Sequence, residues 1–447
     1  MNGMKALVRH ECRLLLRDRA FAAAMLLFAG LTVFAVANGA RWLGQRRASI
    51  AIERARSENR GLSLPTLLEH RAVLEPAPAA ALAVGRGDLD PFASRVNMLT
   101  VRHRLFAQWQ LANPLLLLAG RFDLAFLIVY LFPLLIIALT YNVLSSEREQ
   151  GTLVMVLAQP VRLRALLAAK IGVRGVAVLA AAAIVTAAAS SFAIDFGASG
   201  AAFALIAWLL ATVLYGAFWF ALALWINAAG RSSATNAVAL ITIWVGLVIV
   251  TPVLLNLGVA AMHPLPSRLA LLQSTRAVEN ATSRASSRLL GRFYHDHPEL
   301  VPVADRMHFT RSAYAVRLEQ EWHLLPAILA YEGQLRAQQA AIDRWRFASP
   351  AVLTSELLSR IAGNDRMRFL AYQDAVRAFV LTWRRRLVAD YYLGRPLPPA
   401  AVRSLPQFRF DDPPLVRIGD SLLALAAMTL LVAAAGFLAL RRYRVTH

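Results

Sequence analysis

Six long apolar stretches without a charged side chain constrain this chain more than any other feature. A helix that crosses a membrane needs about 20 consecutive apolar residues, because lipid offers no partner to an exposed backbone polar group. Composition agrees, since 58% of the 447 residues are hydrophobic and only 17% are charged. The pattern predicts an all-α membrane protein whose six transmembrane helices are residues 20–37, 124–144, 175–194, 201–226, 237–262 and 421–440.

The orientation follows from the short connections, because arginine and lysine accumulate on the cytoplasmic side of a membrane. Residues 1–19 carry five basic and two acidic side chains, and the connection 145–174 is also basic. The loop 195–200, by contrast, carries Asp195 and no basic residue. We therefore expect both termini in the cytoplasm, with the chain as a multi-pass protein of a bacterial inner membrane.

The connection 263–420 falls on the outer side and is long enough to form a helical periplasmic domain with its own core. Its patterns predict helices at 268–290, 304–346 and 364–392. A proline-rich return at 396–414 is expected to be extended and to lead back to the last membrane helix.

The last of these helices carries apolar side chains three and four residues apart, among them Phe379 and Trp383. Such a stripe requires a partner. The prediction is a helical hairpin with residues 304–346, kinked at Pro326, with both rings between the two helices. Asn364 is expected as the N-cap of the last helix.

The other long connection, residues 38–123, also falls on the outer side. Helices are expected at 40–60 and 91–111, and prolines such as Pro65 and Pro76 interrupt the region between them. We expect this region to pack on the larger periplasmic domain rather than to fold separately.

Several chemistries are excluded by residue type. A P-loop requires a lysine followed by serine or threonine, but the two lysines, Lys5 and Lys170, are followed by Ala6 and Ile171. The chain therefore cannot hydrolyse ATP, and no enzyme activity of its own is expected. The net charge of +21 comes from scattered arginines, whereas nucleic-acid binding usually requires a basic patch. No nucleic acid is expected as a partner.

The densest group of possible metal ligands is the segment His295-Asp296-His297-Pro298-Glu299. Pro298 interrupts a helix, so the two histidines lack the four-residue spacing that presents both rings on one face. We interpret the segment as a cap between helices and keep His295 and His297 as weak metal candidates.

The connection after the second apolar stretch contains the most distinctive motif. It reads Ser-Ser-Glu-Arg-Glu-Gln-Gly-Thr from residue 145, continues to Pro160 and ends at Lys170. Gly151 and Pro160 bracket a short apolar helix, and a second short helix leads from Leu163 to Lys170. Spacing alone leaves open whether this elbow is an ordinary interfacial loop or a docking element.

The elbow, the six stretches and an amphipathic helix at residues 1–19 together resemble the type-2 ABC transporter permease family. The resemblance implies the membrane-spanning permease subunit of an ATP-driven exporter. The elbow would be its coupling helix, which docks on an ABC ATPase subunit that binds ATP and magnesium, while this chain holds no cofactor. A second permease, identical or paralogous, would complete a dimer. The family motif falls on Glu147, Glu149, Gly151, Thr152, Pro160 and Lys170.

Two other functions remain open from the residues. The first is a membrane-anchored enzyme that acts on envelope polymers or lipids through the periplasmic domain, for which the cluster from His295 to Glu299 would be needed. The second is a structural or receptor protein, which would have no ATPase partner. The substrate is not determined by the sequence, because no membrane stretch carries a charge that would select one.

Overall fold

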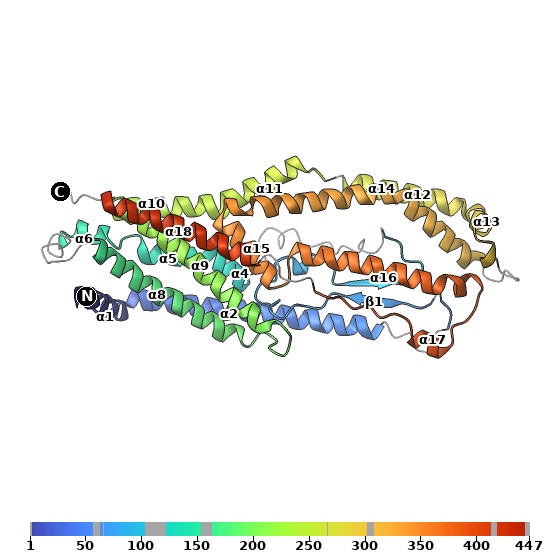
Figure 1. Ribbon diagram of the computed structural model, residues 1–447, viewed down its shortest axis with the longest axis horizontal. Coiled ribbons are helices and arrows are strands. Elements are labelled where there is room, and N and C mark those ends of the chain that lie inside the picture. Colours follow the sequence, from blue (N-terminus) through green and yellow to red (C-terminus); the bar gives the residue numbers. More distant parts are fainter. Residues whose placement is uncertain are drawn as a thin grey trace.

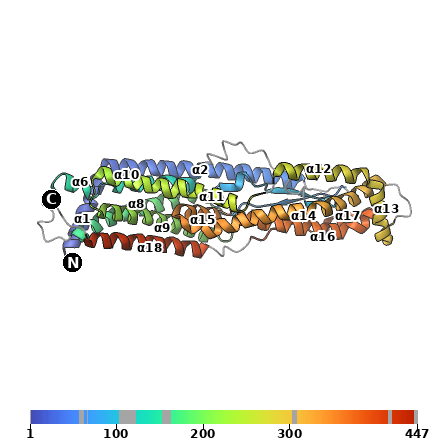
Figure 2. The ribbon, with the colours of Figure 1, turned by 90° about the horizontal axis from the view of Figure 1, so that it is seen from above.

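The computed structural model describes residues 2–56, 63–65, 67–102, 122–152, 163–265, 267–301, 308–412 and 418–442. The molecule is elongated, with a bundle of long helices at one end and a second domain at the other (Figure 1). Helix α1 and the end of α18 lie at the same free end of the bundle, which we call the proximal end (Figures 1 and 2). We call the described residues of 67–102, 267–345 and 366–412 the distal domain.

Among the described residues, six helices are long and apolar enough to cross a membrane. This confirms the six apolar stretches as helices and identifies the chain as a multi-pass membrane protein. Two of the spans are each interrupted by a short π-helical turn, η3 or η4. The elements of the spans are α2 (Arg19–Arg56), α4 (Leu124–Phe126), η3 (Leu127–Leu131), α5 (Phe132–Thr140), α8 (Leu163–Ser190), α9 (Ala201–Ala228), α10 (Ser233–Trp244), η4 (Val245–Val250), α11 (Thr251–Met262) and α18 (Ile418–Arg442).

The first span is much longer than its apolar stretch. Helix α2 has 38 residues, or about 57 Å at 1.5 Å per residue, whereas the hydrocarbon core is about 30 Å thick. The helix expected at residues 40–60 is therefore the end of α2 as far as Arg56, and residues 57–60 lie outside the described part of the chain. Asp18 separates α2 from α1 (Asn2–Arg17). Its carboxylate accepts the backbone N–H of Ala20, in the first turn of α2, at 2.9 Å.

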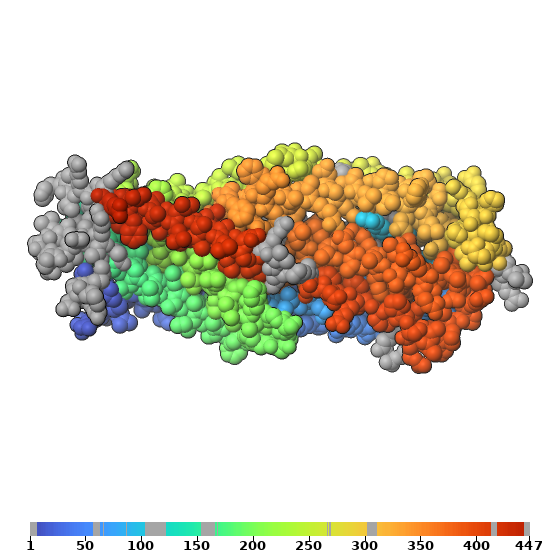
Figure 3. Space-filling model, viewed as in Figure 1, coloured from blue at the N-terminus to red at the C-terminus, as the bar shows by residue number. Residues whose placement is uncertain are grey.

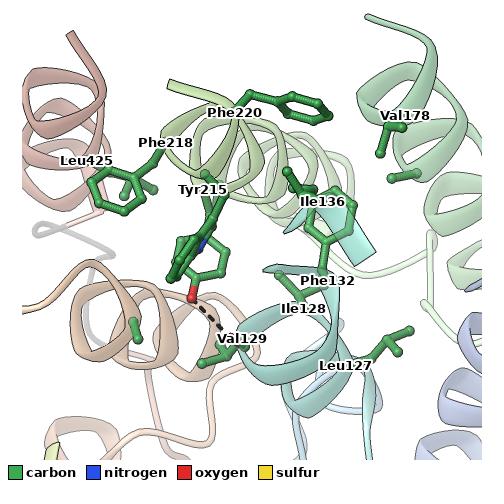
Figure 4. Close-up of a cluster of buried hydrophobic side chains, with 14 of the residues drawn as sticks. Leu127, Ile128, Val129, Phe132, Ile136, Val178, Tyr215, Phe218, Phe220 and Leu425 are labelled. Atoms are coloured by element: carbon green, nitrogen blue, oxygen red, sulfur yellow. Dashed lines mark hydrogen bonds between the residues drawn. The ribbon is translucent and has the colours of Figure 1, made fainter. Parts of the chain in front are cut away.

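The turn η3 directly precedes a proline. The Phe132 N–H bonds the carbonyl of Leu127, and Pro133 has no N–H that could reach the Val129 carbonyl four residues before it. Instead, the hydroxyl of Tyr215 on α9 donates to Val129 at 3.0 Å (Figure 4). A side chain of another span thus replaces the missing backbone hydrogen bond.

The turn η4 repeats this arrangement before Pro252. The Ser349 hydroxyl donates to the Leu247 carbonyl at 2.6 Å, although Ser349 lies about 100 residues further along the chain. Ser349 also caps α15 (Pro350–Ile361) by accepting the N–H of Ala351. Both interrupted spans are therefore fixed by hydroxyl groups from other elements.

Helix α15 was not predicted from the sequence. It contacts α9, α18 and both π-helical turns. Its buried side chains, including Leu353, Leu357 and Leu358, belong to the same apolar cluster as the spans. The long connection between α11 and α18 therefore contributes a helix to the core of the bundle as well as forming most of the distal domain.

The distal domain is mainly helical and contains one small sheet. Strands β1 (His70–Val73) and β2 (Ala93–Val96) pair in antiparallel fashion, with His70 opposite Val96. The other elements are α12 (Arg268–Arg284), α13 (Ser286–Asp296), α14 (His308–Trp345), α16 (Arg366–Tyr392), α17 (Pro399–Arg403) and the 3-10 turns η1 (Gly85–Asp88) and η5 (Pro298–Leu300). The turn η6 (Arg346–Ala348) follows α14 and leads to α15, outside this domain.

The helices expected from the 263–420 connection are found with changed boundaries. The helix expected at 268–290 is two helices, because the chain turns at Ala285 between α12 and α13. Helix α14 continues through Pro326, and residues 304–307 of that prediction lie outside the described chain. The N-cap of α16 is Asp365 rather than Asn364. The Asn364 amide instead donates to the carbonyl of Ala83 at 2.6 Å.

The helix predicted at 91–111 is wrong over β2, and its residues from 103 onward lie outside the described chain. Val96 and Met98 are buried whereas Arg95 is exposed, so the local pattern has the two-residue period of a strand. Residues of this region nevertheless pack on the larger domain as expected, because Leu68 and Ala72 belong to the same buried cluster as the α16 side chains.

The predicted packing of the aromatic stripe is also wrong. Phe379 and Trp383 do not lie between α14 and α16, because both rings pack on the His70 ring of β1. The distances between ring centroids are 5.2 Å for Phe379 and 5.9 Å for Trp383. The Trp383 indole donates to the Pro406 carbonyl at 3.0 Å. The stripe is therefore covered by the sheet and by the return segment, which contains α17 and is otherwise irregular as far as residue 412.

Candidate functional site

The elbow at the proximal end begins with α6 (Ser145–Glu149). Gly151 follows with a φ of +72°, a left-handed conformation that favours glycine. Gly151 and Thr152 are exposed, and the Thr152 hydroxyl donates to the Glu147 carbonyl at 3.1 Å. The described part of the elbow is thus a compact turn with an exposed tip.

A buried cluster of charges lies beneath this turn. The ammonium group of Lys170, on α8, lies 2.7 Å from Glu147 and 3.1 Å from Glu11 of α1. Lys170 is 6% exposed and Glu11 is 5% exposed. Because charged groups are rarely buried unless they are paired, this cluster holds α1, α6 and α8 in one relative position.

The second carboxylate of the motif binds a different helix. Glu149 accepts the Ser233 backbone N–H at 2.7 Å and the Ser233 hydroxyl at 2.9 Å. An anion is favourable at this place because Ser233 is the first residue of α10, where the helix dipole is positive. The Arg148 guanidinium donates to the carbonyl of Gly230. The elbow is therefore also fastened to the α9–α10 connection.

The end of α5, just before the elbow, is held by side chains from the three following spans. Arg174 of α8 donates to the Leu139 carbonyl at 2.7 Å. The Asn227 amide of α9 donates to Thr140 at 3.0 Å, and the Asn236 amide of α10 donates to Tyr141 at 3.3 Å. These are carbonyls that the end of a helix leaves without an intrahelical partner. The elbow is thus continuous with a network that joins α5, α8, α9 and α10.

Five of the six motif residues lie in the described part of the chain, and the structure brings Lys170 to Glu147. Gly151 and Thr152 form the exposed end of the described turn. Glu147 is turned inward to Lys170, and Glu149 is exposed but bound to α10, so neither carboxylate is simply offered to solvent. Pro160 and the short helix expected after Gly151 lie outside the described residues. The helix expected from Leu163 to Lys170 is the start of α8.

Sequence reasoning missed Glu11, Ser233 and the two asparagines. Glu11 lies on the apolar side of the amphipathic helix, three residues after Val8 and four residues before Leu15, where an acidic side chain is unusual. Its role could have been suspected because it is one of only two acidic residues in a basic segment. Asn227 and Asn236 flank the short connection after the fourth span, where polar side chains are common. Only the three-dimensional contact reveals their function.

The weak metal candidates lie at the far end of the distal domain. His295 and His297 are exposed, and the His297 ring packs on Phe293 with 4.7 Å between ring centroids. Its Nδ1 lies 3.5 Å from Glu299. Within the described chain, no three or more His, Cys, Asp or Glu side chains gather in a way that could hold a metal ion.

Comparison with known proteins concerns the distal domain. Residues 268–411 match a protein family described as a domain of unknown function (DUF3526). No curated protein matches the chain. The family match begins at the start of α12 and ends in the return segment, and it leaves out β1 and β2, which supply Ala72 and Val96 to the core of the same domain.

Proposed function

We propose that this chain is the membrane-spanning permease subunit of an ATP-driven ABC transporter that exports a substrate with energy from a separate ATPase subunit. In this proposal the proximal end faces the cytoplasm of a bacterium and the distal domain faces its periplasm. ATP and magnesium belong to the ATPase, because the two lysines of this chain stand outside any P-loop sequence. A second permease, identical or paralogous, completes the assembly.

The observation that carries the proposal is the buried cluster of Lys170, Glu11 and Glu147. Burying ions costs several kcal/mol each, and a loop that merely connects two spans gains nothing from that cost. In a coupling element the cluster has a use, because a force on the exposed tip at Gly151 and Thr152 passes directly to α1 and α8. The side-chain caps on the end of α5 extend the same connection to α9 and α10.

The test is copurification of the tagged chain from its native membrane. An ATPase with a P-loop should accompany it, and Thr152→Arg should reduce the amount by about tenfold, because a long charged side chain at the tip would separate the two surfaces. Ser199→Arg is the matched control, since Ser199 is also exposed but lies in the connection at the opposite end of the bundle. Absence of any ATPase, or equal recovery with both variants, would refute the proposal.

The orientation is tested separately by thiol labelling. After Cys12→Ser, a Ser199→Cys variant in intact cells stripped of their outer membrane should react with an impermeant maleimide. An Ala234→Cys variant should react only after the cells are broken, although both positions are exposed in the structure. Labelling of the second variant in intact cells would reverse the proposed topology.

A further inference from the structure

A groove runs between α14 and α16 in the distal domain and has no part in the proposed coupling. It encloses a cavity of about 330 Å³, within the size range of small-ligand sites. Figure 3 shows a furrow between these two helices, with part of the segment that follows β2 visible at its base. The groove is therefore open on one face of the molecule.

At the groove α14 and α16 are joined by ion pairs, whereas their aromatic contacts, Tyr314 with Tyr391 and Tyr392, lie further along the two helices. Glu321 of α14 pairs with Arg384 of α16 at 2.6 Å, and Glu332 pairs with Arg377 at 2.5 Å. Arg377 and Arg384 lie seven residues apart, or about 10 Å along the helix. The aromatic stripe of α16 faces the sheet instead, so the space between the two ion pairs is not filled by large rings from α16.

The walls of the groove between the ion pairs are apolar. Leu318, Trp322 and Leu325 come from α14, while Val380 and Leu381 come from α16. Trp322 is 73% exposed and Leu381 is 48% exposed, so two large apolar side chains on opposite helices face solvent. Covering such surface is favourable, at about 25 cal/mol per Å², and a tryptophan of this kind often dominates the energy of binding.

The side chains that line the groove carry more guanidinium groups than carboxylates. Arg102 and Arg377 share Glu332, at 2.6 and 2.5 Å. Asp374 is shared in the same way by Arg377 and Arg336, at 2.8 Å each. Of the charged side chains that line the groove itself, Arg102, Arg377 and Arg384 are basic and Glu321 is acidic. The Arg377 side chain is 13% exposed, and this burial lowers its pKa.

We propose that the groove between α14 and α16 binds a single-chain amphiphile with one anionic head group. Its chain lies between Trp322 and Leu381, and its carboxylate or phosphate lies beside Arg102 and Arg377. Arginine suits both head groups because its planar fork matches the oxygens of either. The idea that this amphiphile is the exported substrate rests on the proposed function, whereas the binding itself does not.

The test uses the purified full chain in phosphatidylcholine nanodiscs. The probe is a long-chain fatty acid with a photoreactive diazirine at the end of its chain. Peptides of α14 and α16 that line the groove should be labelled, and Trp322→Ala should reduce this labelling by about tenfold, equivalent to about 1.4 kcal/mol. Trp345→Ala is the matched control, because Trp345 is an exposed ring on the same helix outside the groove. Equal labelling of these two variants would overturn the proposal.

The head group is tested with a second pair of variants. Arg102→Gln should weaken labelling by the acid but not by the alcohol of the same chain length. Arg336→Gln removes a charge from the same ion-pair network at a position outside the groove, and it should have a smaller effect. Competition by a single-chain phosphate, compared with the unlabelled acid, distinguishes the two head groups. Equal labelling by acid and alcohol in the native protein would refute an anionic ligand.

These results separate the two proposals. Labelling of the groove without any copurifying ATPase would remove the transport role and retain the binding site. An accompanying ATPase without labelling of the groove would retain the transport role and remove this ligand class.

Discussion

Replacing Lys170 by methionine should release α1 from the rest of the proximal end. Methionine keeps most of the length and apolar volume of lysine but removes the charge. Glu147 and Glu11 would then lie close together without the cation that lies 2.7 and 3.1 Å from them. The two carboxylates are on different helices, so their repulsion acts to separate α1 from α6.

The magnitude follows from the geometry. At an effective dielectric constant of about 20, Coulomb attraction at these two distances is about 6 and about 5 kcal/mol. Desolvation offsets much of this, and removal of one partner from a buried ion pair costs about 3–5 kcal/mol. The Glu147 side chain is 24% exposed whereas that of Glu11 is 6% exposed. Glu147 can therefore regain water in the variant, while Glu11 can do so only if α1 moves away.

The native chain provides its own reporter for this movement. Cys12 is the only cysteine of the sequence and is exposed on α1. A nitroxide attached there reports the mobility of α1 by electron paramagnetic resonance without any engineered site. We expect a restricted spectrum in the native protein and a mobile component in Lys170→Met. Arg231→Met, which removes an exposed positive charge at the same end, should leave the spectrum unchanged.

A second substitution makes the reasoning refutable. Glu11→Gln in the Lys170→Met background removes the repulsion and should restore much of the restricted component, because a neutral amide can remain buried beside Glu147. If Lys170→Met leaves the spectrum of the native protein unaltered, apolar contacts alone hold α1 and the cluster does not couple it to α8. Failure of the double variant to recover would show that the lost attraction, rather than carboxylate repulsion, frees the helix.

Three further outcomes are expected. Gly216→Ala should cost about 1–3 kcal/mol in thermal unfolding, because the new Cβ would lie 2.4 Å from a Leu179 methyl group, whereas Gly172→Ala, with open space around it, should cost nothing. Trp383→Ala should destabilise the distal domain by about 3–5 kcal/mol, measured by its protease resistance, since the ring is 1% exposed. Burial lowers the pKa of His70 below 6.5, so the unfolded chain binds the proton first and stability is lost as the pH falls below that value. The backbone N–H of Phe408 donates to His70. Amide exchange of residues 404–412, corrected for intrinsic rates, should therefore accelerate below pH 6.5. The variant His70→Gln should abolish this pH dependence.

The sequence by itself determined the six membrane helices, because that requirement is local. An apolar stretch in lipid must satisfy its backbone hydrogen bonds within the helix, whatever surrounds it. The long helices of the distal domain were likewise predictable from periodicity, with errors at Ala285 and at the N-cap of α16. Asn364 and Asp365 are both ordinary capping residues, and the choice between them depends on the Ala83 carbonyl that Asn364 binds.

Only the tertiary structure decided where the functional side chains point. The motif places Glu147 and Glu149 two residues apart, but their partners, Lys170 and Ser233, lie on different helices. Glu11 reaches the same lysine from the start of the chain. The aromatic face of α16 that contains Trp383 is covered by His70 of β1. The position of His70 is set by its pairing with Val96 of β2, which again joins residues far apart in sequence. Such contacts are selected by the packing of whole elements, and periodicity within one segment carries no information about which element will cover it.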